Sequence, residues 1–181
     1  WTLLLTVVAF AGGAIIGIAV ALLRVAQFAP LRSIGFAYVQ LIQGTPLLVL
    51  LFVFYFGLAI VGLPVLPWIA AAAAFSIYGG AFLGEIWRGA LQAIPRQQWE
   101  AGAALGLSTA EQLRYVIVPQ AWRIAIPPTV GFLVQLIKGT SIASIIGFVE
   151  LTRAGQLIVN VTFQPMTVYP IVAVLYFIVC W

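Results

Sequence analysis

Long apolar stretches, separated by short polar connections, dominate the chain. A helix that spans a membrane needs about 20 mostly apolar residues, and four stretches of the sequence approach or exceed that length. A fifth stretch holds only 13 residues, which at about 1.5 Å each cover roughly 20 Å of a roughly 30 Å hydrocarbon core. We therefore expect the chain to be trimmed at its ends and to continue after the printed sequence. The predicted spans are residues 3–23, 38–60, 68–85, 127–148 and 169 onward.

The composition makes lipid the solvent for much of this surface. Hydrophobic residues are 64% of the chain and charged residues 7%, whereas a soluble domain has roughly 45–50% and about 25%. The sequence has no His, no Asp and a single cysteine, Cys180, so we expect no metal site and no internal disulfide. The net charge of +4 is not a sign of nucleic-acid binding, because its distribution follows the connections. The predicted fold class is an all-α polytopic membrane protein with five transmembrane helices.

The basic residues predict the orientation of these spans. Lys and Arg collect in the connections that face the cytoplasm, and here five arginines fall in the first and third connections, which lie on the same side. The second connection has no basic residue, and the fourth has only Arg153. We therefore expect the N-terminus outside and the C-terminus inside. The five arginines are Arg24, Arg32, Arg96, Arg114 and Arg123.

The long third connection, residues 94–126, has helices of its own. Residues 99–106 are rich in Ala and Gly, and Gly106 is suited to end a helix. Ser108 and Glu111 have the spacing of a capping box, in which each side chain satisfies a backbone N–H group of the other residue. The second helix should run to Val118 and stop at Pro119. Two short helices joined by a tight turn are either a knob that another protein holds or a simple connection between spans.

At this point the residues resemble a family. Residues 100–106 and 117–119 resemble the EAA loop of bacterial ABC importer permeases, and other segments resemble the polar amino-acid (histidine/glutamine/arginine type) permeases. Two positions depart from that pattern: Gly102 replaces the second alanine of the loop core, and Gly139 stands where an acidic residue is expected. The similar segments are residues 43–48 (Gln-Gly-Thr-Pro-Leu-Leu), 54–57 (Phe-Tyr-Phe-Gly), 85–90 (Glu-Ile-Trp-Arg-Gly-Ala), 93–101 and 138–147.

This resemblance implies one permease domain over residues 1–181, with residues 94–126 as its cytoplasmic coupling loop, in the inner membrane of a bacterium. It implies the membrane path of an ATP-driven importer of polar amino acids. The implied partners are a dimer of ATP-binding subunits, a second permease subunit that is identical or related, and a periplasmic or lipid-anchored amino-acid-binding protein. The chain has no Gly-x-x-x-x-Gly-Lys-Ser/Thr loop, so we expect no catalytic residue and no cofactor of its own, with ATP bound by the partner subunit. The coupling residues would be Glu100, Ala101, Gly102, Ala103 and Gly106.

Two charged residues lie inside predicted spans. Lys138 and Glu85 both stand ten residues from prolines near the cytoplasmic side, roughly 15 Å deep by helical rise, where a charge needs a partner or a watery cavity. Lys138 would meet a substrate carboxylate and Glu85 its amino group, or the two would pair with each other, or Glu85 with Arg88. Further pathway candidates, which interhelical packing explains equally well, are Thr140, Ser141, Ser144, Tyr78 and Gln43.

Other classes of function remain open at the level of the sequence. A permease of the same kind for an opine, cystine or a small peptide would have the same features. A stand-alone channel or secondary transporter would use the loop as a mere connection, although five spans without an inverted repeat argue against it. A membrane anchor that moves no solute is a third alternative.

Overall fold

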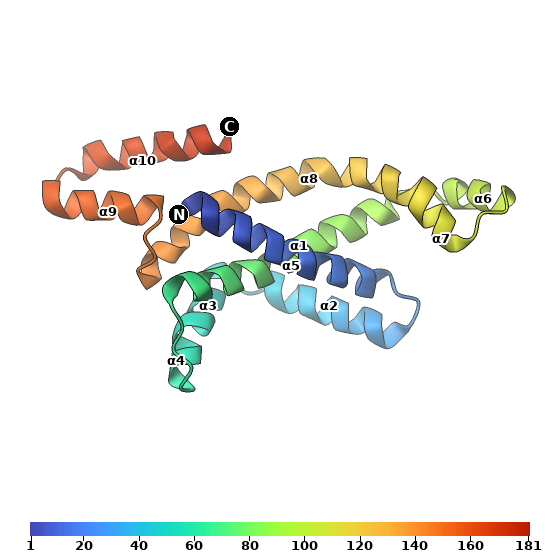
Figure 1. The fold of residues 1–181 in the computed structure, drawn as a ribbon, viewed down its shortest axis with the longest axis horizontal. Helices are drawn as coiled ribbons and strands as arrows, with labels where there is room; N and C mark the ends of the chain where they lie inside the picture. The colour runs from blue at the N-terminus through green and yellow to red at the C-terminus, as the bar shows by residue number, and fades with distance from the viewer.

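The computed structural model describes residues 1–181 as an elongated, all-helical molecule in which most of the long helices run along one axis (Figure 1). The pair α6 and α7 stands at one end, called here the hairpin end, and α9 with α10 lies toward the other (Figure 1). The elements are α1 (Thr2–Val25), α2 (Ala29–Gln43), α3 (Leu47–Phe52), the π-helical η1 (Val53–Gly57), α4 (Leu58–Ile60), α5 (Pro67–Gln92), α6 (Arg96–Ala104), α7 (Thr109–Glu111), the π-helical η2 (Gln112–Ile117), α8 (Val118–Gly139), the 3-10 helical η3 (Thr140–Ile146), α9 (Leu151–Thr162) and α10 (Pro165–Cys180).

The first and third predicted spans form the central pair of helices, α1 and α5. Glycines bring their backbones together: a Cβ atom added to Gly13 would lie 3.1 Å from the Cα atom of Gly79, and one added to Gly17 would lie 3.1 Å from the backbone nitrogen of Gly84. Small residues four apart on one helix face allow such an approach. The sequence Gly13-x-x-x-Gly17 in the first predicted span has the spacing that predicts such close packing, and the structure confirms it.

The second predicted span, residues 38–60, is not one straight helix. It is broken between α2 and α3, and the segments on either side are bent by 97°. Pro46 precedes α3 and has no N–H group to continue the ladder of α2, and a residue that precedes a proline is disfavoured in the helical region. The helix is therefore not continuous over the second predicted span, and α3 and α4 turn away from the long axis (Figure 1).

The fourth predicted span belongs to a much longer helix. Helix runs without interruption from Thr109 to Ile146, 38 residues, about 57 Å at the usual rise. Pro119 does not end it, because the π-helical turns of η2 come directly before this residue, and such a local adjustment accommodates the missing N–H group of a proline. Pro127 and Pro128 also lie inside α8. The predicted helix end at Val118 is corrected, and Pro127, where the fourth span is expected to start, lies within a continuous helix.

The polar segment after the fourth predicted span is helical as well. It forms α9, and Phe163 with a φ of 55° turns the chain into α10. Helix α10 begins at Pro165, four residues before the predicted start, and none of its 16 residues is buried. Three helices are long and apolar enough to cross a membrane, or four if the bent pair counts as one span.

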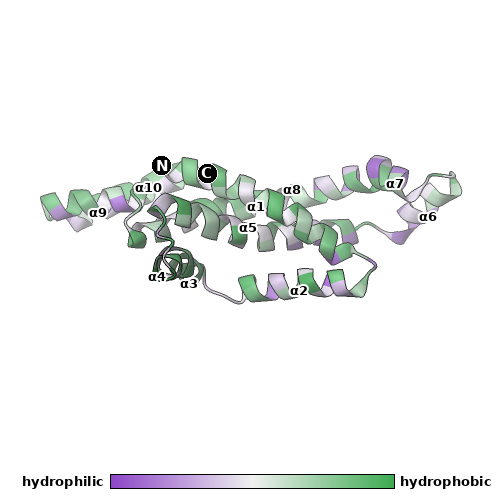
Figure 2. Cartoon of the chain, turned by 60° about the horizontal axis from the view of Figure 1, so that its bottom comes forward, coloured by the Kyte–Doolittle hydropathy of each residue, from purple (hydrophilic) through white to green (hydrophobic).

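Hydropathy along the ribbon agrees with a membrane environment for the long helices. Figure 2 shows apolar residues along α1, α5, α8 and α10, while polar residues gather at α6, α7 and part of α9. Large apolar side chains face outward on these long helices, among them Ile15 at 72%, Val130 at 53% and Val174 at 56% exposed. Water would penalise such a surface and lipid would not.

Candidate functional site

The hairpin end is built by two short local motifs. Gly106 adopts a φ of 75°, which ends α6 at little steric cost because glycine has no Cβ atom. Two residues later the Ser108 backbone N–H group donates to the Glu111 carboxylate at 2.8 Å, and the Glu111 N–H group donates to the Ser108 hydroxyl. The predicted capping box is confirmed. The Ser108 hydroxyl also donates to the Glu111 carboxylate at 2.7 Å. This bond, together with the bond from the Ser108 N–H group, holds the pKa of the exposed Glu111 carboxyl below its ordinary value.

Packing inside the hairpin explains why a glycine stands at position 102. Gly102 is buried, and a Cβ atom added there would lie 2.9 Å from Cγ of Gln112. The Gln112 amide in turn donates to the Leu107 carbonyl at 2.8 Å, which ties η2 to the turn. Gly102 therefore faces inward and makes room for Gln112. The other predicted coupling residues are exposed on the outside of the hairpin: Glu100, Ala101, Ala103 and Gly106.

The base of the hairpin is anchored in an apolar cluster. Trp99 packs against buried residues at the end of α5 and the start of α8, so α6 sits on both long helices at once. The Gln120 amide also donates to Gln98 at 3.2 Å and joins α8 to α6. A force on the hairpin therefore reaches both long helices. The cluster is Ala90, Ile94, Ile117, Ala121 and Ala125.

Glu85 lies between two arginines. Its carboxylate accepts from the Arg24 Nε atom of α1 at 3.3 Å and from the Arg88 Nε atom of its own helix at 2.8 Å. Arg24 also lies over the Phe36 ring of α2, 5.0 Å from its centroid. The predicted pairing of Glu85 with Arg88 is confirmed, and the alternative pairing with Lys138 is not found. The cluster ties together α1, α2 and α5.

Lys138 occupies a different place. It lies in the last turns of α8 and is exposed, and its ammonium group has no ion-pair or hydrogen-bond partner within the chain. Together with residues of η3, α9 and α10 it lines a groove of about 560 Å³. This groove contains several polar groups: Lys138, Ser141, Thr152, Tyr169 and Tyr176.

The other predicted pathway residues are engaged in packing. Thr140 and Ser144 are buried, and their hydroxyls donate to backbone carbonyls three residues earlier at 2.7 and 2.6 Å. Tyr78 stacks with Phe82 and Phe132 in the core. The Gln43 amide donates to the Ala81 carbonyl across the interface of α2 and α5 at 3.4 Å. Only Ser141 among these residues shares the groove with Lys138.

One charged residue beside this groove, Glu150, is not among the sequence-predicted site residues. Glu150 is 2% exposed, and its carboxylate accepts the backbone N–H groups of Thr152 and Arg153 at 2.9 and 2.8 Å. It also accepts the Tyr176 hydroxyl at 2.7 Å. The signal in the sequence was an acidic residue directly before a helix start, which is a favoured position for a cap.

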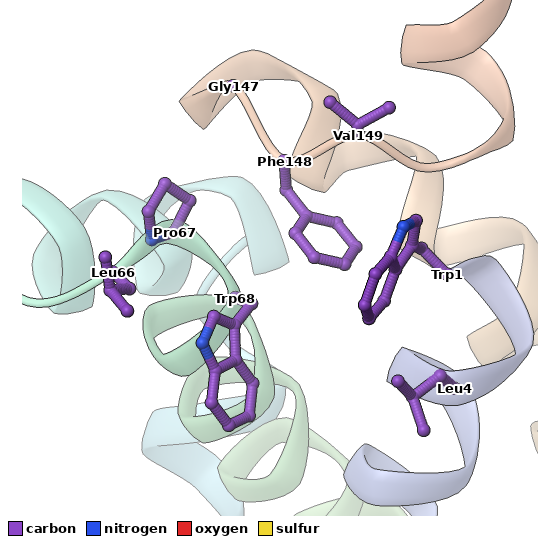
Figure 3. A pocket seen from close by; sticks show the side chains of 8 residues that line it. All are labelled: Trp1, Leu4, Leu66, Pro67, Trp68, Gly147, Phe148 and Val149. Carbon is purple, nitrogen blue, oxygen red and sulfur yellow. The ribbon is translucent and has the colours of Figure 1, made fainter.

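A second hollow at the end of the molecule opposite the hairpin has no such chemistry. It has a volume of about 540 Å³ and lies between the start of α1, the start of α5 and the turn after η3. Figure 3 shows its wall, which consists mainly of the rings of Trp1, Trp68 and Phe148. It offers no charged group to a polar solute.

The geometry defines a class: a polytopic helical membrane protein with a polar hairpin at one end and an unpaired cation in a groove far from it. Residues 13–180 match the family of the binding-protein-dependent transport system inner membrane component. The chain belongs to this family.

Individual relatives agree over nearly the whole chain. It is 38% identical to the glutamine transport system permease protein GlnP of Escherichia coli over 98% of its own length and 82% of that protein. It is also 38% identical to the L-cystine transport system permease protein TcyB of Bacillus subtilis, over 100% of this chain and 78% of that protein. The crystal structure of an amino acid ABC transporter with histidines superposes with a TM-score of 0.94 at 35% identity, covering 99% of this chain and 84% of that one.

Proposed function

We propose that this chain is the permease subunit of an ATP-driven importer of polar amino acids. The observation that carries the proposal is the hairpin, a small-residue surface seated on α5 and α8 by the Trp99 cluster in a chain of this transport family. Relatives at 38% identity are permeases of glutamine and L-cystine transport systems. The chain would supply the path, and an ATP-binding subunit would supply hydrolysis.

Coupling would occur at the outer surface of the hairpin. Glu100 offers a charge to a basic groove, while Ala101, Ala103 and Gly106 permit close approach of another backbone. Gly102 would act indirectly, by keeping α6 against Gln112. Movement of the ATP-binding dimer would then pass through α8 to the groove at its other end.

The membrane topology that fits this role has five spans, with α10 as the fifth. The N-terminus lies outside, and the hairpin and the C-terminus lie in the bacterial cytoplasm. The arginines of the hairpin, Arg96 and Arg114, support this orientation by the positive-inside rule. The partners would be the ATP-binding dimer, a second identical or related permease subunit, and an amino-acid-binding protein outside. A solute's carboxylate would meet Lys138, the unpaired cation of the groove, with the Ser141 hydroxyl beside it.

The first experiment is purification from native membranes in mild detergent, followed by an ATPase assay with each amino acid and the co-purified binding protein. Co-purification of an ATP-binding subunit, with hydrolysis stimulated by a group of amino acids, is the expected result. A chain that purifies alone and transports solute down an ion gradient would contradict the proposal and favour a secondary transporter.

A variant of the hairpin tests the coupling surface. Glu100→Lys combined with Gly106→Trp reverses the charge and adds bulk where backbone approach is needed. Coupled transport should be lost while the protein still reaches the membrane. Unchanged transport by this double variant would exclude the hairpin as the coupling contact.

A further inference from the structure

Glu150 differs from Glu85 in how its charge is balanced. Glu85 lies between two guanidinium groups, whereas Glu150 is more deeply buried and forms no ion pair. Its carboxylate is held only by two backbone N–H groups and one phenol. A buried charge is expensive without a compensating cation. The N-terminus of α9, which Glu150 caps, offsets part of this cost, and the Tyr176 phenol is the one side chain that donates to the carboxylate.

Tyr176 connects this anion to the groove of Lys138. Its side chain lines that groove and also the neighbouring hollow that Glu150 lines. The phenol donates its proton to Glu150 at 2.7 Å. The contact of 3.2 Å with the Thr152 hydroxyl must therefore have Thr152 as donor, since the phenol has a single proton.

The phenol and hydroxyl oxygens of this arrangement belong to side chains that line the groove, and each oxygen can still accept a hydrogen bond. A phenol that donates to a carboxylate is polarised, and its oxygen becomes a better acceptor. Thr152 also lines the groove and keeps a lone pair on its hydroxyl oxygen. The groove therefore has a cation on α8, Lys138, and a set of acceptors backed by a buried anion on α9 and α10. Such a pair of opposite charges matches a zwitterion.

We propose that Tyr176 and Thr152, oriented by Glu150, receive the α-ammonium group of the amino acid whose carboxylate meets Lys138. Tyr176 and Thr152 would contact the solute, and Glu150 would be a positioning residue. This inference rests on the proposed function, because it assigns the second charge of the same solute. It predicts a site that requires a free α-amino group and does not depend on the identity of the side chain.

A comparison of two ligands on the purified complex with its ATP-binding subunit tests the assignment. The probes are the amino acid that stimulates hydrolysis most in the assay above and its 2-desamino analogue (for glutamine, 4-carbamoylbutanoate). Binding to the complex, without the binding protein, is measured by calorimetry. The native complex should bind the analogue about tenfold to a hundredfold more weakly, as expected for a lost charged hydrogen bond.

Removal of the phenol oxygen should abolish this preference. In Tyr176→Phe, affinity for the amino acid should fall about tenfold while affinity for the desamino analogue stays unchanged, so the ratio collapses toward one. Glu150→Gln should shift the ratio in the same direction. Tyr55→Phe is the control, because Tyr55 lies in η1, outside the groove; it should leave both affinities unchanged.

A purely structural role gives a different result. If Tyr176→Phe weakens both probes equally, or leaves their ratio at the native value, the inference is overturned. If Tyr176→Phe does not fold, Thr152→Val serves instead, and the ratio of its affinities for the amino acid and the desamino analogue should also fall toward one. A native complex that binds no amino acid contradicts the proposed function instead, so the two failures are distinguishable.

Discussion

Gly13 of α1 and Gly79 of α5 lie backbone against backbone, since a Cβ atom on Gly13 would come within 3.1 Å of both the Cα and the carbonyl carbon of Gly79. Backbone atoms cannot rotate away as a flexible side chain can. We expect Gly13→Val to lower the free energy of unfolding by about 1–3 kcal/mol, the usual cost of overpacking. Thermal unfolding in detergent would show this as a lower midpoint.

The control for this prediction is Gly89 in α5, where an added Cβ atom meets nothing within 4 Å. Gly89→Ala should be neutral or stabilising, because alanine is a better helix former by up to about 1 kcal/mol. Equal midpoints for Gly13→Val and the native protein would show that the two helices are not in close contact.

The charge cluster of Glu85 predicts a coupled loss of stability. Glu85→Gln would leave Arg24 and Arg88 facing each other in half-buried positions. We expect a loss of about 1–3 kcal/mol, below the cost for a fully buried pair because these side chains keep some exposure. The measurement is a double-mutant cycle with Arg24→Met, whose combined effect should be smaller than the sum of the single effects. Additive effects would mean that the two groups do not interact.

The turn of the hairpin predicts a selective loss of coupling. Gly106 has a φ of 75°, a conformation that costs a β-branched residue on the order of 1–2 kcal/mol. In Gly106→Val we expect transport-coupled ATP hydrolysis to fall several-fold. Gly106→Asn is the control, because asparagine tolerates this conformation. If both variants lose coupling to the same degree, side-chain bulk and not backbone conformation is the cause.

The contact between Gly102 and Gln112 predicts a rescue. Gly102→Leu should displace Gln112, whose Cγ atom lies 2.9 Å from the added Cβ position, and so loosen the hairpin. Stimulated ATP hydrolysis by the complex should fall, and a second substitution, Gln112→Ala, should restore part of it by making room. Failure of the second substitution to restore any activity would show that Gly102 contacts the partner directly.

Local motifs were predicted well from the sequence because each depends on residues close together in the chain. The Gly13–Gly17 spacing, the Ser108–Glu111 box and the stop at Gly106 all fall into this group. Each motif satisfies its own hydrogen bonds or contacts, so tertiary structure does not override it. The all-helical class followed for the same reason, from runs of apolar residues.

The sequence does not predict features that depend on the direction of a helix or on residues far away in the chain. Apolarity gives the length of a span but not its bend, so the hydropathy pattern does not show the break before Pro46. Pro119 was expected to end a helix, but the π-helical turns of η2 place it in the first turn of α8. The environment of Glu150 is set partly by Tyr176, which is 26 residues away, and nothing in the sequence near Glu150 indicates that partner.

Helix α10 buries none of its 16 residues, and the only side-chain hydrogen bonds that connect it to the rest of the chain are those of Tyr176. An isolated subunit therefore holds this helix with little more than one phenol and the packing of Val172 on Gly155. Elements with so few contacts open at low free energy. Maturation of the subunit should thus finish late, when neighbouring lipid or protein covers α10, and an orphan subunit would expose this helix first to cellular quality control.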